Sequence, residues 1–170
     1  MATGALQREI LQTRPFSSPA EEAALGLLRT SDVLRRFLAN VAQPQGITLQ
    51  QYNVLRILRG AGPEGLPTLE IGARMIEEAP GTTRLLGRLE RKGLAERHRC
   101  PKDARRVLCR ITSAGLKLLQ ALDRPMRRAS AAFFAPLRGG DARRLIRFLD
   151  DVRSPLTDVR SALTQGGHSK

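Results

Sequence analysis

At 170 residues the chain is long enough for one domain with a buried core, and its 29 basic and 16 acidic residues leave a formal charge of +13, which suggests a polyanionic partner. With no Trp, one Tyr and five Phe, the core must be mainly aliphatic, which favours helices packed on helices. Two Cys are too few for a disulfide framework, and no run approaches the roughly 18 apolar residues that span a bilayer, so we expect a cytoplasmic protein without a membrane segment.

The N-terminal part of the chain predicts one long helix. Residues 1–16 read as a loosely ordered lead-in, and the stretch from Ser18 to Glu21 is a capping box with proline at the first helical position. From Ala24 to Val41, apolar residues recur at steps of three and four. The pattern predicts an amphipathic helix of about 24 residues, longer than a small core can cover.

Three short helices are predicted next. A second capping box, Thr48 to Gln51, starts the first of them, and "GPEGLP" after it reads as a loop. The three helices cover residues 49–58, 68–76 and 82–93. The buried side of the third should consist of Leu85, Leu86 and Leu89. Gly93 fits the left-handed position that ends such a helix.

After Gly93 the apolar period changes from helical to strand-like. The stretches "LAERHR" and "VLCRIT" flank the turn-rich "CPKDAR", so we predict a two-stranded hairpin with a charged loop. Thr112 then starts a second long helix with Pro125 inside it, where a kink is expected. Gly139 and Gly140 break the chain before a last helix that Asp141 can cap.

Positive charge is concentrated in residues 82–110. This segment has ten basic and three acidic residues, a net charge of +7 in 29 residues, where an even spread would give about +2. A basic surface that serves only solvation is the alternative, and the clustering argues against it. Two short helices joined tightly and followed by a basic hairpin are typical of a winged helix-turn-helix.

A winged helix-turn-helix places the start of its second helix in the major groove of DNA and its hairpin on the backbone or minor groove. The candidate DNA-contacting residues are Thr82, Thr83, Arg84 and Arg88 on the helix, and Lys102, Asp103, Arg105 and Arg106 on the hairpin. Asp103 is expected to hydrogen-bond the Arg105 guanidinium and fix its direction. Arg91 and Lys92 can instead complement the helix dipole.

Several motifs in the right order resemble the MarR family of bacterial transcriptional regulators. The resemblance covers residues 25–160, and its specific part is "TTRLLGRLERKGLAERHRCPKDARRVLCRITSAGLKLL", residues 82–119. It implies a homodimer with interlocking terminal helices that binds a pseudo-palindromic double-stranded operator. It also implies a repressor that a small aromatic or phenolic effector releases. Gly87, where an acid is common, and Pro67, where a capping Ser or Thr is common, depart from the family pattern.

The predicted architecture is mainly α with a small β-hairpin wing. Its parts are a lead-in (1–16), a helical dimerisation region (17–46 and 112–164), a winged helix-turn-helix (47–111) and a polar tail (165–170). The long helices expose more apolar surface than the centre can cover, which favours a dimer, although they could pack on each other in a monomer. Three aromatic residues would border the family's effector pocket or belong to the core: Phe37, Tyr52 and Phe133.

Other classes of function fit the sequence less well. The histidines are His98 and His168, and no paired carboxylates, phosphate-binding loop or catalytic triad stands out, so we expect no enzyme, metal or cofactor. RNA-binding modules stack bases on aromatic side chains, and residues 53–132 contain no Phe, Trp or Tyr. A non-specific architectural DNA-binding protein remains the alternative.

Cys100 and Cys109 enclose the basic loop, but they do not form a recognisable sulfur site. Zinc requires about four ligands, and His98 is the one further ligand nearby. A disulfide is not expected in a reducing cytoplasm. The two cysteines therefore read as small strand residues, and oxidation of Cys100 beside its basic neighbours is a hypothesis. The family's peroxide sensors carry a reactive Cys near the first helix, and none precedes Cys100 here.

Overall fold

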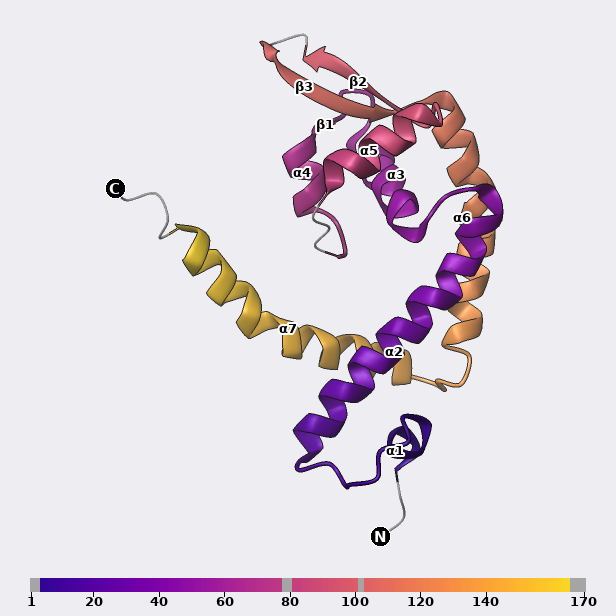
Figure 1. The fold of residues 1–170 in the computed structure, drawn as a ribbon, viewed down its shortest axis with the longest axis vertical. Helices are drawn as coiled ribbons and strands as arrows, with labels where there is room; N and C mark the ends of the chain where they lie inside the picture. The colour runs from indigo at the N-terminus through magenta and orange to yellow at the C-terminus, as the bar shows by residue number, and fades with distance from the viewer. Residues whose placement is uncertain (1–3, 78–80, 101–102, 166–170) are drawn as a thin grey trace. The chain divides into compact units, whose positions relative to one another are not determined.

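The computed structural model describes residues 4–77, 81–100 and 103–165, and side chains as far as Ser154 except that of Ala104 (Figure 1). Two compact units, residues 1–129 and 130–170, are considered separately. The elements are α1 (Ala5–Glu9), α2 (Pro19–Ala42), the 3-10 turn η1 (Gln43–Gln45), α3 (Leu49–Ala61), β1 (Leu66–Pro67), α4 (Thr68–Ala73), α5 (Thr82–Arg91), β2 (Ala95–Cys100), β3 (Asp103–Ile111), α6 (Ser113–Phe133) and α7 (Asp141–Gln165). This order confirms the predicted mainly helical fold with a small hairpin. Among the described helices, none is both long and apolar enough to cross a membrane.

Helix α2 begins as the sequence predicts, with one change in its cap. The Ser18 side chain accepts a hydrogen bond from the backbone N–H of Glu21, and Pro19 is the first helical residue. The Glu21 carboxylate accepts at 2.6 Å from both the hydroxyl and the backbone N–H of Ser17, rather than from Ser18. These bonds lower the pKa of Glu21. The predicted box is therefore half formed, with its return bond displaced by one residue.

The cap of α3 is a complete capping box. Thr48 accepts from the N–H of Gln51, and the Gln51 side chain accepts from the N–H of Thr48. Gly62 ends the helix with a φ of 73°. The predicted capping box is therefore confirmed in full for α3, whereas α2 forms only the Ser18 half of its box.

The N-terminal segment contains a helix that the sequence did not predict. Helix α1 lies in the expected lead-in, and Glu9 pairs with Arg29 of α2 at 2.8 Å. Leu6 also packs beside Gly26 of α2, where a Cβ would lie 3.6 Å from the Leu6 side chain. Such tertiary contacts can order a five-residue helix whose sequence has no strong signal of its own.

The sheet has three antiparallel strands in the order β1-β3-β2, one more than predicted. The loop-like "GPEGLP" contributes β1, which pairs Leu66 with Cys109 and Pro67 with Leu108. Gly65 makes this approach possible: its φ is 74°, and a Cβ there would lie 2.3 Å from the carbonyl oxygen of Cys109. Strand β3 begins at Asp103, so the predicted six-residue loop is shorter than expected.

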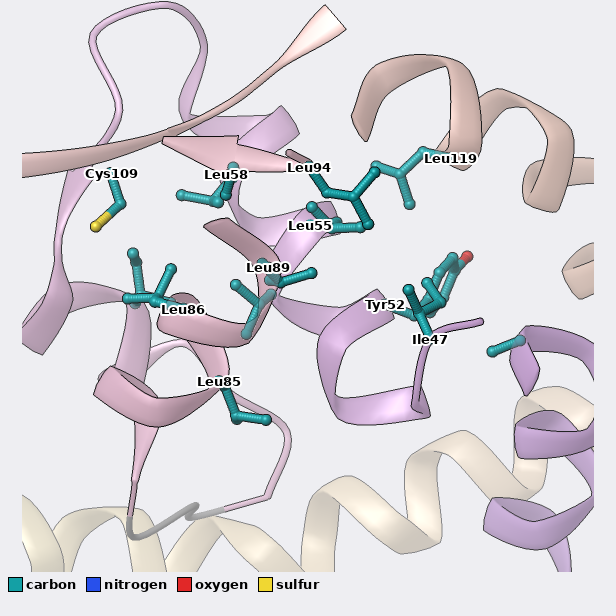
Figure 2. Close-up of a cluster of buried hydrophobic side chains, with 14 of the residues drawn as sticks. Ile47, Tyr52, Leu55, Leu58, Leu85, Leu86, Leu89, Leu94, Cys109 and Leu119 are labelled. Atoms are coloured by element: carbon teal, nitrogen blue, oxygen red, sulfur yellow. The ribbon is translucent and has the colours of Figure 1, made fainter. Parts of the chain in front are cut away.

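One aliphatic core joins the helices to the sheet. Figure 2 shows Leu86 and Leu89 of α5 lying near Leu55 and Leu58 of α3, with Cys109 of β3 beside them. Every leucine predicted to be buried in α5 is buried. Residues of α6 complete the cluster: Leu119, Leu122 and Met126. Helix α5 is therefore fixed between α3 and the sheet.

The later helix boundaries differ slightly from the prediction. Helix α4 ends at Ala73 rather than near Ile76, and α6 ends at Phe133, before Leu137. Asp141 is the first residue of α7 and pairs with Arg144 at 3.7 Å. The predicted tail begins inside α7, and its residues 166–170 lie outside the described part of the chain.

Candidate nucleic-acid interface

Helix α5 buries one side and presents the other to solvent. Its three leucines enter the core, whereas the predicted contact residues Thr83, Arg84 and Arg88 are exposed on the opposite side. Figure 1 shows the hairpin of β2 and β3, the wing, extending past α4 and α5. The basic side chains of α5 are thus accessible to a partner such as a DNA groove.

The start of α5 has no side-chain cap. Gly81 holds the N-cap position with a φ of 118°, and no side chain of the described residues bonds there. Thr82, also a predicted contact, is half-buried, and its hydroxyl lies 3.3 Å from where a Cβ on Gly72 would be. The Thr82 side chain therefore packs against α4, while its backbone N–H belongs to an uncapped helix start of the kind that binds anions.

The wing places Arg105 on β3 with an exposed side chain. The Asp103 carboxylate accepts a hydrogen bond from the backbone N–H of Arg105 at 3.0 Å. This contact differs from the predicted one to the Arg105 guanidinium, and it stabilises the start of β3 as Asp side chains often do near turns. Lys102, the other predicted contact at the tip, lies outside the described residues.

Three arginines of the basic segment have acidic neighbours. The pairs are Arg97–Glu90 at 2.8 Å, Arg110–Glu96 at 2.6 Å and Arg106–Glu70 at 3.9 Å. Arg106 was a predicted DNA contact, and its long, exposed pair is weak enough to exchange for a phosphate. Arg97 and Arg110 are held by their carboxylates more closely.

Four other exposed arginines form no ion pair or side-chain hydrogen bond within the described residues: Arg84, Arg88, Arg99 and Arg105. Arg99 was not among the predicted sites. The signal that identifies it is strand alternation, which puts Arg99 on the same side of β2 as Arg97. These four arginines, on α5 and the wing, are exposed cations to which the described residues offer neither an acidic partner nor a side-chain hydrogen bond.

Arg91 and Lys92 bond to carbonyl groups. Arg91 donates to the carbonyl of Gly87 at 3.4 Å, within the last turn of α5, and Lys92 donates to the carbonyl of Gly46. The Arg91 contact agrees with the alternative that this side chain complements the helix end. Lys92 instead ties α5 to the segment before α3.

The three aromatic residues predicted near an effector pocket lie in different environments. Tyr52 is buried in the core, where burial raises its pKa, and the Arg56 guanidinium lies 5.9 Å from its ring centre. Phe37 is partly exposed on α2. Phe133 belongs to the second unit, where its ring packs edge to face on Phe134 at 5.2 Å.

A cavity of about 270 Å³ lies between α2, α3 and the segment after α4. Its lining mixes apolar and charged side chains, and none of the predicted aromatic residues contributes to it. The residues are Arg35, Ala39, Thr48, Leu49, Gln50, Asn53, Met75, Ile76 and Glu77.

The cysteines are free, and they do not face each other. Cys100 pairs with Asp103 and is half-buried, whereas Cys109 pairs with Arg97 and is buried. The Thr68 hydroxyl lies 3.9 Å from the Cys109 sulfur, at hydrogen-bond distance for sulfur. In the described ranges, no group of three or more His, Cys, Asp or Glu side chains could hold a metal ion.

Known proteins with this arrangement regulate transcription. A sequence model of the MarR family matches residues 45–106. The HTH-type transcriptional regulator FarR of Neisseria gonorrhoeae is 30% identical over 108 residues, 64% of this chain and 73% of FarR. A MarR transcription factor from Planctomyces limnophilus is 38% identical, with a TM-score of 0.61 over 80% of this chain and 98% of its own. S. aureus MepR, solved as a DNA complex, shares the fold at 24% identity and a TM-score of 0.68, over 76% of this chain and 95% of MepR.

Proposed function

Since the chain belongs to the MarR family of transcriptional regulators, we propose that it is a repressor that binds a specific double-stranded DNA site as a homodimer. Helix α5 enters the major groove, and the wing contacts the flanking backbone or minor groove. Two copies read the two halves of a pseudo-palindrome. The MepR structure, which has the same fold and contains DNA, supports this mode of binding.

The observation that carries the proposal is the distribution of uncompensated charge. Arg84 and Arg88 on α5, and Arg99 and Arg105 on the wing, are exposed and without acidic partners within the described residues. A phosphate backbone supplies the missing anions, and guanine supplies a bidentate acceptor for an arginine on α5. Helix α5 and the wing thus each present arginines that could bind phosphate, and those of α5 could also bind guanine.

The homodimer is supported by exposed apolar side chains on the terminal helices. Leu27 and Leu28 lie exposed on α2, and Ile146, Phe148 and Val152 lie exposed on α7. Large apolar side chains that stay exposed are available for burial against a partner. A second copy is the partner that a palindromic DNA site requires.

The experiment that tests the function is selection of bound fragments from the source genome, followed by affinity measurement. We expect the recovered duplex to bind at least a hundredfold more tightly than a scrambled duplex of equal length at the same salt concentration. Equal affinities would contradict a sequence-specific regulator and favour the architectural DNA-binding alternative. A reporter gene placed behind the recovered site should be repressed by the protein.

Release by a small aromatic or phenolic effector is part of the proposal. Phe37, Tyr52 and Phe133 stay the predicted ligand contacts, and the cavity beside Leu49 and Met75 is a second candidate site for the effector. Titrating phenolic acids into the protein–DNA complex and measuring fluorescence anisotropy tests this step. A ligand that lowers the affinity of the protein for DNA should bind more weakly to the DNA-bound protein than to the free protein, because the effects of ligand and DNA on each other's binding are reciprocal.

A further inference from the structure

We propose that the ion pair between Glu90 and Arg97 is a positioning contact, which holds the wing in a fixed orientation to helix α5. The inference rests on the proposed function, because it concerns how the two DNA-contacting elements are held relative to each other. It assigns Arg97 to positioning, although its charge and place in the wing would suggest a DNA contact.

The pair is short and partly shielded from water. The Arg97 Nη1 atom lies 2.8 Å from Oε2 of Glu90, and the two side chains are 35% and 25% exposed. Among the ion pairs of the described residues it is the least exposed; the next, Arg59–Asp123, is 36% and 30% exposed. Partial burial lowers the local dielectric and strengthens the attraction between the two charges.

The pair lies beyond the point where the base of the wing is anchored. At the base, Leu94 N–H donates to the Leu89 carbonyl at 2.9 Å, and the Thr112 hydroxyl donates to the Gly93 carbonyl at 2.7 Å. Arg97 is three residues further along β2 and connects back to the last turn of α5 through Glu90. The base contacts fix where the wing starts, whereas the ion pair fixes the direction in which it continues.

The direction of the wing decides where the Arg99 side chain lies relative to α5. Alternate residues of a strand project to the same side, so Arg99 follows Arg97 on one side of β2. Holding Arg97 against α5 therefore sets the distance between Arg99 and the cations of α5. DNA grooves have fixed spacing, so simultaneous contact with the major groove and the flanking backbone depends on this distance.

Simple electrostatics and positioning predict opposite results for one substitution. Glu90→Gln removes a negative charge from a DNA-binding face, so charge alone predicts equal or tighter binding to every duplex. If the pair positions the wing, the same variant binds the selected duplex more weakly. The two explanations therefore differ in whether the variant binds DNA more tightly or more weakly, and not only in how large the change in affinity is.

The matched control is Glu96→Gln, which makes the same charge change. Glu96 pairs with Arg110 at 2.6 Å, and this pair joins β2 to β3 inside the wing without reaching α5. Binding is measured with the duplex selected from the genome and with its scrambled version at the same salt concentration. Hydroxyl-radical footprinting of each complex reports separately on the groove occupied by α5 and the backbone beside the wing.

We expect Glu90→Gln to weaken binding to the selected duplex about three- to tenfold, and to leave binding to the scrambled duplex unchanged or tighter. Protection beside the wing should be lost, while protection by α5 remains. Glu96→Gln should keep wild-type affinity, and Arg97→Lys should retain more affinity than Arg97→Gln. Wild-type or tighter binding of Glu90→Gln, or equal losses in both acidic variants, would overturn the proposal.

Amide hydrogen exchange of the free protein separates this inference from the proposed function. In Glu90→Gln the amides of β2 should exchange faster than in wild type and in Glu96→Gln, at an unchanged thermal midpoint. If the wild-type protein binds the selected and scrambled duplexes equally, the proposed function fails. The hydrogen-exchange rates of β2 in the free protein still test whether the ion pair holds the wing. Unchanged exchange in β2 would show that Glu90 does not hold the wing.

Discussion

Arg84 and Arg105 carry the same charge but lie in elements with different predicted roles. Arg84, in the first turn of α5, is the predicted base contact, and Arg105, on the wing, is the predicted phosphate contact. We expect Arg105→Gln to weaken binding to every duplex and to lower the salt dependence by about one counterion, and Arg84→Gln to reduce the preference for the selected site by about 1–3 kcal/mol.

The measurement is the affinity for selected and scrambled duplexes across a series of salt concentrations. Arg110→Gln is the matched control, because it removes the same charge from an arginine already paired with Glu96. If Arg84→Gln leaves the ratio of the two affinities at the wild-type value, Arg84 does not read bases.

Gly115 lies where a side chain cannot be accommodated. A Cβ on this residue would lie 2.3 Å from the Leu94 carbonyl oxygen and 2.7 Å from Cγ1 of Ile111. We expect Gly115→Ala to lower the free energy of unfolding by about 1–3 kcal/mol, measured by urea denaturation.

Gly87 is the control for Gly115, because an alanine at this position has free space around it. It lies inside α5, and a Cβ there would meet no atom within 4 Å. Gly87→Ala should raise the free energy of unfolding by about 0.5–1 kcal/mol, because alanine favours the helix. Destabilisation by Gly87→Ala would contradict the open space around Gly87, and unchanged stability of Gly115→Ala would contradict the close approach to Leu94.

Helices α3 and α6 are joined by an ion pair that gives stability a dependence on pH. Arg59 Nη1 donates to both carboxylate oxygens of Asp123 at 3.1 and 2.9 Å, and these bonds lower the Asp123 pKa. The contribution is present above the pKa of an unfolded Asp, about 4, and is lost as pH falls through the lower folded value.

Asp123→Asn should therefore reduce stability at pH 7 by up to about 1 kcal/mol, since both side chains are about one-third exposed. The difference from wild type should shrink below about pH 4. Thermal midpoints measured from pH 3 to pH 7 check this, and a difference that does not depend on pH would contradict a charge effect.

Local signals explain which elements the sequence could predict. The starts of α2 and α3 depend on caps within four residues, and the buried side of α5 depends on the spacing of its leucines. Strand β1 has two residues and no periodicity, and it forms because β3 offers a free edge next to Gly65. Helix α1 likewise depends on contacts with α2.

The basic segment could be located from the sequence, but its division into paired and unpaired cations could not. The partners Glu70 and Glu90 lie in other elements than Arg106 and Arg97, so only the folded chain brings them together. Strand alternation could have placed Arg99 beside Arg97, but its lack of a partner among the described residues becomes visible only when the other pairs are known.

For the molecule as a whole, the exposed apolar side chains of α7 predict how assembly affects DNA binding. Phe148 is 64% exposed, and we expect Phe148→Glu to weaken the proposed dimer at least tenfold, as measured by sedimentation velocity. Affinity for the selected duplex should fall with it, because a monomer contacts half of a palindrome.

Leu69→Gln is the control for this prediction. Leu69 is 88% exposed, but it lies on α4, outside the terminal helices. Its replacement should leave the sedimentation coefficient unchanged. A wild-type chain that sediments as a monomer at micromolar concentration would contradict the dimer itself.

Among the described residues, no side chain caps the start of α5, in contrast to the starts of α2 and α3. Ser18 and Thr48 complete the starts of α2 and α3, but Gly81 supplies no side chain to the first N–H groups of α5. A phosphate at that position would act as the missing cap, so the ligand would finish the helix as well as bind to it. Operator DNA should then act as a stabiliser of the fold, raising the melting temperature with concentration and slowing amide exchange in the first turn of α5.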